Sequence, residues 1–211
     1  GMTHGLGLEI LGRDLQIFEA KRTIGALDLL TRDKEGEVTH WEFAYKLYLQ
    51  CGAGTGWGSW LGPAGKDRLS LKLAHLLEHQ LPLSERAEAR ASLNTLGIEG
   101  IDQRRVVMQG TLFSPWGMAP VKAAQAEVAA EGRWLRESEL SHLVATHPEW
   151  RWVARRKPLW FGPAHRSLES LSGEQMLSLL PLKESLLFSR LEDQSDLLVF
   201  VVPESWGRKA E

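Results

Sequence analysis

An alternation of apolar and polar side chains over residues 38–49 is the strongest constraint on how this chain folds. The odd positions of this run hold large apolar side chains: Trp41, Phe43, Tyr45, Leu47 and Leu49. The even positions include the polar side chains of His40, Glu42 and Lys46. A period of two is typical of a β-strand that is buried on one face. The pattern predicts a long strand whose odd face packs in the core and whose even face carries the polar groups.

A second strand is predicted over residues 23–31, joined to the first by a turn at residues 33–36. The turn centres near position 35, so positions that sum to about 70 face each other. Asp28 therefore lies opposite Glu42. Asp28 shares its strand face with three apolar side chains, those of Ile24, Ala26 and Leu30. A carboxylate on such a face is a candidate functional group.

Two carboxylates that face each other across a hairpin repel by up to roughly 1 kcal/mol, and by more where water is excluded. A shared proton, a lysine or a divalent cation would offset this repulsion. One or two carboxylates, completed by water and phosphate oxygens, are enough to hold Mg²⁺. Lys46 lies on the same face as Glu42 and could orient or deprotonate an attacking water. A cross-strand ion pair on a solvated face accounts for the same spacing.

A helix is predicted over residues 66–80, because leucines recur along it at helical spacing. Beside the leucines runs a basic stripe formed by Arg68, Lys72, His75 and His79. These side chains are candidate contacts for the phosphates of a nucleic acid. An ordinary solvated helix face explains them equally well.

The rest of the chain adds helices and strands in alternation. Helices are predicted over residues 85–96, capped by Ser84 and ended by Gly97, and over residues 122–130 and 138–145. Strands are predicted over residues 106–113 and over the wholly apolar residues 197–202. The order of elements indicates an α/β fold with a mixed sheet and helical cover.

Residues 151–166 are both basic and aromatic. The cations are Arg151, Arg155, Arg156, Lys157 and Arg166, and the rings between them are Trp152, Trp160 and Phe161. Cations interleaved with stacking side chains suit single-stranded nucleic acid. A lid over the sheet with charged edges is the alternative interpretation.

Composition narrows the class of protein further. The formal charge of −2 is unlike that of a protein that coats DNA, although enzymes acting on nucleic acid can be near neutral. Cys51 is the single cysteine, which excludes an internal disulfide and a cysteine-built zinc site. The longest clean apolar run, residues 197–202, is too short to span a bilayer. A cytoplasmic protein without a membrane partner is expected.

The segments Gly25-Ala26-Leu27-Asp28-Leu29-Leu30 and residues 40–49 resemble the central hairpin of the PD-(D/E)XK nuclease-like superfamily. More narrowly, the chain resembles an uncharacterised bacterial family, a domain of unknown function grouped with that superfamily. Further matching stretches are Gly62-Pro63, Asp67-Arg68-Leu69, Leu71-Lys72-Leu73, Gln80-Leu81 and Gly110-Thr111-Leu112-Phe113. The resemblance covers roughly residues 8–115.

The resemblance implies a restriction-endonuclease-like fold, which is a mixed β-sheet with a central antiparallel hairpin and flanking helices. It also implies a superfamily-like core over residues 2–115. Residues 116–211 would be a C-terminal extension that packs on this core and includes the late strand 197–202. The chain departs from the superfamily pattern at Lys46, which stands four residues after Glu42 instead of two, about 13 Å along a strand instead of about 7 Å. It also starts almost directly at the first strand, so the first core helix of the superfamily is missing or truncated.

The function that the resemblance implies is that of a metal-dependent phosphodiesterase, a nuclease acting on DNA or RNA. Asp28 and Glu42 would hold Mg²⁺ or Mn²⁺, and Lys46 would assist catalysis. Two alternatives remain open. One is a nucleic-acid-binding module that keeps the scaffold without turnover. The other is a structural or assembly protein whose exposed sheet edge pairs with another chain, for instance in a homodimer.

Overall fold

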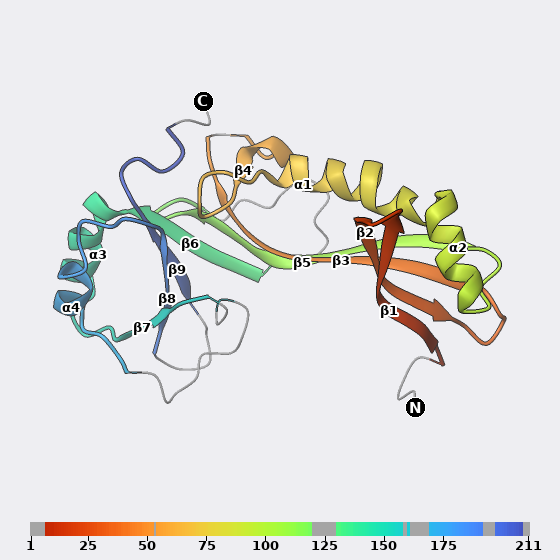
Figure 1. The fold of residues 1–211 in the computed structure, drawn as a ribbon. Helices are drawn as coiled ribbons and strands as arrows, with labels where there is room; N and C mark the ends of the chain where they lie inside the picture. Colours follow the sequence, from red (N-terminus) through yellow and green to blue (C-terminus); the bar gives the residue numbers. More distant parts are fainter. Residues whose placement is uncertain are drawn as a thin grey trace. The chain divides into compact units, whose positions relative to one another are not determined.

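The computed structural model describes residues 7–52, 54–119, 130–157, 160, 169–191 and 197–208. Among these residues, nine strands form a mixed sheet accompanied by four α-helices (Figure 1). The predicted α/β class with a mixed sheet is therefore confirmed. By packing, the chain divides into two compact units. Unit 1 comprises Gly1–Tyr45 and Leu71–Gln109, and unit 2 comprises Lys46–Ser70 and Gly110–Glu211.

Unit 1 places two strands and the first parts of two others beneath a helical segment (Figure 1). Its strands are β1 (Glu9–Glu19), β2 (Arg22–Arg32), the first part of β3 (Val38–Gln50) and the first part of β5 (Gln103–Pro115), in the sheet order β1-β2-β3-β5. Its helical segments are α1 (Leu69–His75) from Leu71 onward, the π-helix η2 (Leu76–Gln80), the 3₁₀-helix η3 (Leu81–Glu85) and α2 (Ala87–Thr95).

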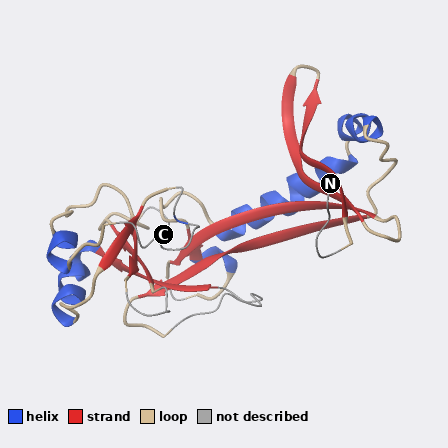
Figure 2. Cartoon of the chain, turned by 90° about the horizontal axis from the view of Figure 1, so that it is seen from below, coloured by secondary structure: helices blue, strands red, loops and turns tan. Residues whose placement is uncertain are grey.

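The hairpin register is the one that the turn position predicts. β2 pairs with β3 antiparallel from Leu29↔Trp41 to Arg32↔Val38, so that partners sum to 70. Beyond Leu29 toward the N-terminus, β2 continues its pairing with β1 alone. The far end of the β1–β2 hairpin extends away from β3 as a result (Figure 2). Asp28 is the first β2 residue past this fork.

The face of β3 that points into the protein is the opposite of the predicted one in unit 1. His40 and Glu42 are fully buried, whereas Phe43 is 47% and Tyr45 is 46% exposed. The prediction that the aromatic face packs in the core is therefore wrong for residues 40–45. The cause is the cover supplied by η2, whose Gln80 side chain donates a hydrogen bond to Glu42. Polar partners on the covering helix make it feasible to bury a polar strand face.

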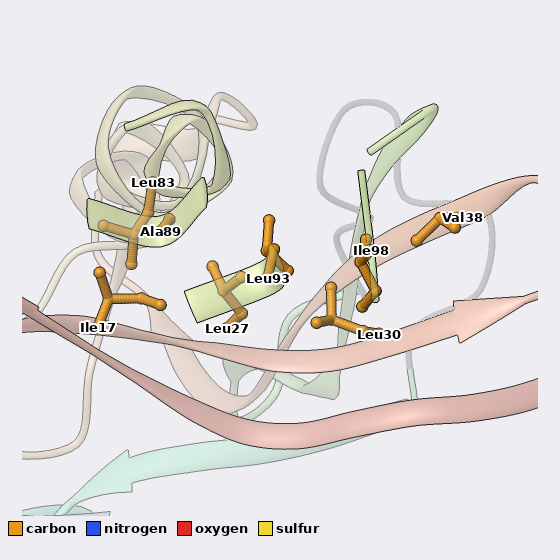
Figure 3. Packing of buried hydrophobic residues seen from close by; sticks show 8 residues of the cluster. All are labelled: Ile17, Leu27, Leu30, Val38, Leu83, Ala89, Leu93 and Ile98. Atoms are coloured by element: carbon orange, nitrogen blue, oxygen red, sulfur yellow. The ribbon is translucent and has the colours of Figure 1, made fainter. Parts of the chain in front are cut away.

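A single apolar cluster joins the strands of unit 1 to its helices (Figure 3). Strands β1, β2 and β3 contribute Ile17, Leu27, Leu30 and Val38, and the covering segments contribute Leu83, Ala89, Leu93 and Ile98. All of these side chains are no more than 6% exposed. This cluster holds η3 and α2 on the sheet and thereby fixes the end of η2, whose last residue is Gln80.

The two helices predicted over residues 66–80 and 85–96 both begin later than predicted. α1 begins at Leu69, so Arg68 precedes the helix and forms an isolated bridge with Leu61 instead. Ser84 lies in η3 and does not cap the next helix, because α2 begins at Ala87 with Arg86 as its N-cap. The Ser84 hydroxyl instead donates to the carbonyl of Leu81.

Unit 2 builds on the second parts of β3 and β5. Its further elements are η1 (Trp57–Ser59), β4 (Trp60–Leu61), β6 (Ala130–Arg136), η4 (Glu137–Glu139), α3 (Leu140–Thr146), β7 (Trp152–Arg155), α4 (Gly173–Leu177), β8 (Leu186–Arg190) and β9 (Leu198–Val202). The strands follow the order β3-β5-β6-β9-β8-β7, with β4 paired to β3. The β5–β6 and β6–β9 ladders are parallel, and the β9–β8 and β8–β7 ladders are antiparallel.

Strand β9 corresponds to the wholly apolar strand that the sequence predicts over residues 197–202. Val199 and Val201 pack in one apolar cluster, whereas Phe200 and Val202 pack in another, so β9 is buried on both faces. The helix predicted over residues 138–145 is formed by η4 and α3. The helix predicted over residues 122–130 lies outside the described residues, apart from Ala130, which begins β6.

Gly110 is the residue whose lack of a side chain matters most for this sheet. A Cβ atom built at Gly110 would overlap the backbone carbonyl oxygen of Lys46 on β3. We expect Gly110→Ala to lower the free energy of unfolding by roughly 1–3 kcal/mol, because backbone rather than a flexible side chain must move. Urea denaturation measures this. Gly100→Ala is the matched control, because a Cβ there meets no atom within 4 Å. An equal, small effect of both substitutions would contradict this reading.

Candidate functional site

The fork between β2 and β3 brings the two hairpin carboxylates together. The backbone N–H of Phe43 on β3 donates to Oδ2 of Asp28 at 2.8 Å. The backbone N–H of Asp28 points at Oε1 of Glu42 at 3.5 Å. The backbone of Asp28 no longer pairs with β3, but its side chain still bonds to that strand. The predicted juxtaposition of Asp28 and Glu42 is present in the structure.

Glu42 is held by two further side chains. His40 lies two residues earlier on the same strand face, and its Nε2 is 2.8 Å from Oε1 of Glu42. The Nε2 amide of Gln80 donates to Oε2 of Glu42 at 2.9 Å. The side chains of His40 and Glu42 are both 0% exposed. A buried carboxylate costs several kcal/mol unless it is well hydrogen-bonded, and these contacts supply the compensation.

A further contact connects this buried group to a cation. Lys72 Nζ donates to Oε1 of Gln80 at 3.0 Å, so the amide of Gln80 bridges the lysine and the carboxylate of Glu42. Gln80 is the last residue of the π-helix η2. Segments of π-helix are rare and often occur at functional sites. We call Asp28, His40, Glu42, Lys72 and Gln80 the fork cluster.

The surroundings of Asp28 in the fork cluster change the pKa of its carboxyl. Burial raises the pKa of the Asp28 carboxyl above its ordinary value of 3.8, and the charge of Glu42 raises it further. The hydrogen bond from the Phe43 backbone opposes this rise in pKa. Asp28 is only partly buried, and among the described residues no side chain or backbone group donates to its Oδ1. This oxygen is therefore available to a proton or a cation.

Sequence reasoning missed two members of the fork cluster. It treated His40 as one of several polar residues on a strand face, and it singled out Gln80 only as part of a matching stretch. The alternation itself carried a signal for His40, because positions 40 and 42 share a strand face. No local pattern placed Gln80 beside Glu42, because that contact joins residues 38 positions apart.

Lys46 belongs to unit 2, where it has partners of its own. Lys46 Nζ lies 3.1 Å from Oδ2 of Asp67, and the Tyr48 hydroxyl donates to the same oxygen at 3.2 Å. Both side chains of the ion pair are about 40% exposed. Burial and the charge of Asp67 raise the pKa of Tyr48 well above its usual range. Asp67 is thus a polar partner of both Lys46 and Tyr48 that the strand pattern did not indicate.

The predicted basic stripe does not form as one helical face. Arg68 precedes α1 and donates from Nη1 to the carbonyl of Gly58 at 2.7 Å. Lys72 contacts Gln80, as described above. The imidazole of His75 is exposed and lies 5.3 Å from that of His79 between ring centroids. Lys72 and His75 remain candidate phosphate contacts within unit 1.

Asp28 and Glu42 are the members of the fork cluster whose carboxylates could hold a divalent cation. Among the described residues, no group of three or more histidine, cysteine or acidic side chains converges as a metal site. A carboxylate offers about four acceptor positions, and three donors approach Glu42. Oδ1 of Asp28 adds a second position. Water and phosphate oxygens would have to complete the shell, as is usual for Mg²⁺.

These features define a mixed α/β protein with a buried polar cluster at a strand fork. The chain belongs to the DUF1853 family, described as a domain of unknown function, whose family model matches residues 1–211. No curated protein and no solved structure matches the chain. The relation to the PD-(D/E)XK superfamily and the restriction-endonuclease-like topology therefore stay predictions. Among the described residues, no helix has the length and apolar character needed to cross a membrane.

The raised pKa of Asp28 predicts a pH-dependent effect of Asp28→Asn. An ionised Asp28 disfavours the folded state, so this penalty is absent below pH 3.8 and grows as the pH rises through the folded-state pKa. The asparagine keeps an oxygen for the Phe43 N–H. We expect Asp28→Asn to raise the free energy of unfolding at pH 7 by up to about 1 kcal/mol. The gain should shrink as the pH approaches 3.8 in urea titrations.

Glu88→Gln is the control of opposite sign. Hydrogen bonds from its own backbone N–H and from Arg86 lower the pKa of the partly exposed Glu88, so its removal should cost stability at neutral pH rather than add it. If Asp28→Asn destabilised the protein equally at pH 4 and pH 7, the assigned electrostatics of Asp28 would be wrong.

Proposed function

We propose that the fork cluster is the centre of a metal-dependent phosphodiesterase, a nuclease acting on DNA or RNA. The observation that carries the proposal is the fork itself, which holds the Asp28 carboxylate against Glu42 although the two repel. Functional sites are where structures retain such unfavourable charge pairs. The same two residues are the ones for which the sequence resemblance implies metal binding.

Each member of the fork cluster has a separate role in this proposal. Asp28 and Glu42 would hold Mg²⁺ or Mn²⁺. When bound, such an ion lowers the pKa of a coordinated water and stabilises charge on the phosphate oxygens. His40 and Gln80 are positioning residues, because they fix the two oxygens of Glu42. A fixed ligand needs no reorganisation when substrate arrives.

The cations that would contact substrate phosphates lie in unit 1 and in unit 2. Lys72 is anchored to Gln80 and, with the exposed His75, offers contacts to phosphates of the bound strand. Lys46 and Arg68 belong to unit 2. The assistance of Lys46 in catalysis and the contact of Arg68 with phosphate stay predictions from the sequence. In unit 2, the amine of Lys46 is held by the Asp67 carboxylate.

A second candidate is a nucleic-acid-binding module without turnover. One observation favours it: Glu42 is fully buried and three protein donors approach it. A carboxylate in that state works as a structural anchor between β3 and η2 without any metal. Under this alternative, the basic residues bind nucleic acid and the fork cluster only stabilises the scaffold.

The experiment that tests the proposal is hydrolysis of labelled single-stranded and double-stranded DNA and RNA with Mg²⁺, Mn²⁺ or EDTA. The wild-type protein is compared with Asp28→Asn and Glu42→Gln, since each amide keeps the shape of the carboxylate and one of its two oxygen acceptors. Glu78→Gln is the matched control, because Glu78 is an exposed carboxylate on the same π-helix. Circular dichroism establishes that each variant is folded.

We expect metal-dependent cleavage that falls at least a hundredfold in Asp28→Asn and Glu42→Gln and is unchanged in Glu78→Gln. Metal-independent binding without cleavage, equally strong in Asp28→Asn, would replace the nuclease by the binding module. Cleavage that survives in both amide variants would show that the activity lies elsewhere in the chain.

A further inference from the structure

Unit 2 contains a cavity of about 520 Å³ whose lining combines cations with an aromatic ring. The side chains around it are those of Pro63, Ala64, Arg155, Arg156, Lys157, Trp160, Glu184, Ser185 and Leu186. A cavity of this size is within the range of small-molecule sites in proteins. The lining holds three consecutive cations and one carboxylate, so the cavity favours an anion.

Two cations of this cavity, Arg156 and Lys157, are not explained by ion pairs among the described residues. Arg156 and Lys157 are exposed, and no carboxylate among the described residues lies within ion-pair distance of either. Arg155 is 5% exposed and stands at the end of β7, where it pairs with Leu187 of β8. The strand therefore fixes the start of the basic run on a rigid element.

Trp160 supplies a fixed aromatic surface at the same place. Its indole N–H donates to the carbonyl of Arg155 at 2.8 Å. The ring packs edge-on against the buried Phe200, with centroids 5.2 Å apart. Lys157 Nζ lies 4.6 Å from the centroid of the Trp160 ring. The indole is therefore held rigidly, and the amine of Lys157 covers one of its faces. A base that stacks on this face would displace the amine toward the phosphate.

We propose that this cavity binds a nucleoside phosphate, as a free nucleotide or as the phosphorylated end of a single-stranded nucleic acid. The base would stack on Trp160, and the phosphate would meet the exposed Arg156 and the amine of Lys157. Aromatic stacking combined with basic side chains is how proteins hold single-stranded nucleic acid without reading its sequence. The site lies wholly within unit 2, and the inference does not rest on the catalysis proposed for unit 1.

A bare phosphate or a lipid headgroup fits the lining less well. Neither would use the Trp160 ring, and the walls formed by Pro63, Ala64 and Leu186 would remain hydrated and apolar. The Ser185 hydroxyl is already donated to the carbonyl of Pro63 at 2.6 Å, so it is not free to donate to a phosphate. Recognition would therefore depend on stacking against Trp160 and on the charges of Arg156 and Lys157.

Fluorescence anisotropy of the full chain in EDTA tests the proposal without cleavage. The probe is a ten-nucleotide single strand labelled at its 3′ end, with or without a 5′ phosphate. The competitors are AMP, adenosine and inorganic phosphate. The variants are Arg156→Glu, Lys157→Glu and Trp160→Leu. Arg208→Glu is the control, because it reverses an exposed charge of unit 2 that does not line the cavity.

We expect the 5′-phosphorylated strand to bind more tightly than the unphosphorylated one, and AMP to displace it better than adenosine or phosphate. Arg156→Glu, Lys157→Glu and Trp160→Leu should each raise the Kd about tenfold, and Arg208→Glu should leave it unchanged. Direct binding of AMP in isothermal titration calorimetry, with no binding of either strand, would assign the site to a free nucleotide.

Three results would overturn the proposal. The first is no binding of nucleotide or strand at millimolar concentration. The second is a Kd that does not respond to the two exposed charge reversals, which are the substitutions least able to disturb folding. The third is binding of anionic vesicles through Arg156 and Lys157 while nucleotides do not compete. Loss of nuclease activity in unit 1 variants bears on none of these outcomes.

Discussion

The fully buried carboxylate of Glu42 is the group on which the arrangement of unit 1 depends. Removing a carboxylate from water costs several kcal/mol, so the protein must surround it with donors. Those donors come from the same strand, from the π-helix η2 and from the backbone of β2. Each of these segments is thereby positioned relative to β3. A different rotation of β3 about its axis would leave His40, Glu42 and Gln80 without partners.

The fork next to Glu42 converts this structural anchor into a candidate site. Where β2 leaves β3, the Asp28 side chain takes over the hydrogen bond that a continuing ladder would make. Only Oδ2 of Asp28 is used in this hydrogen bond, so Oδ1 stays available beside the carboxylate of Glu42. The buried apolar cluster of unit 1 holds this part of β2 in place. Its members Leu27 and Leu30 lie on either side of Asp28 in the sequence and pack beneath η3 and α2. The position of Asp28 is therefore set both by apolar packing and by hydrogen bonding.

The sequence predicted the parts of the fold that follow from local pattern. The hairpin register followed from the position of one turn, and β9 followed from its unbroken apolar run. The exposed face of β3 did not follow, since a period of two fixes which residues share a face but not which face is covered. Burial of His40 and Glu42 requires Gln80, which arrives from a distant helix. The start of α1 and the role of Ser84 were missed for a similar reason. Both depend on tertiary partners, Leu61 for Arg68 and Arg104 for Ser84.

The central claim is that the fork holds Asp28 against Glu42 for a divalent cation. Thermal unfolding of the wild-type protein and of Asp28→Asn, in EDTA and in Mn²⁺, tests it most directly. Mn²⁺ at about a hundred times its Kd should raise the wild-type Tm by at least about 5 °C, because ligand binding to the folded state stabilises it. The Tm of Asp28→Asn should not respond. An equal response of both proteins, or no response of either, would contradict the claim and leave the fork cluster as a purely structural anchor.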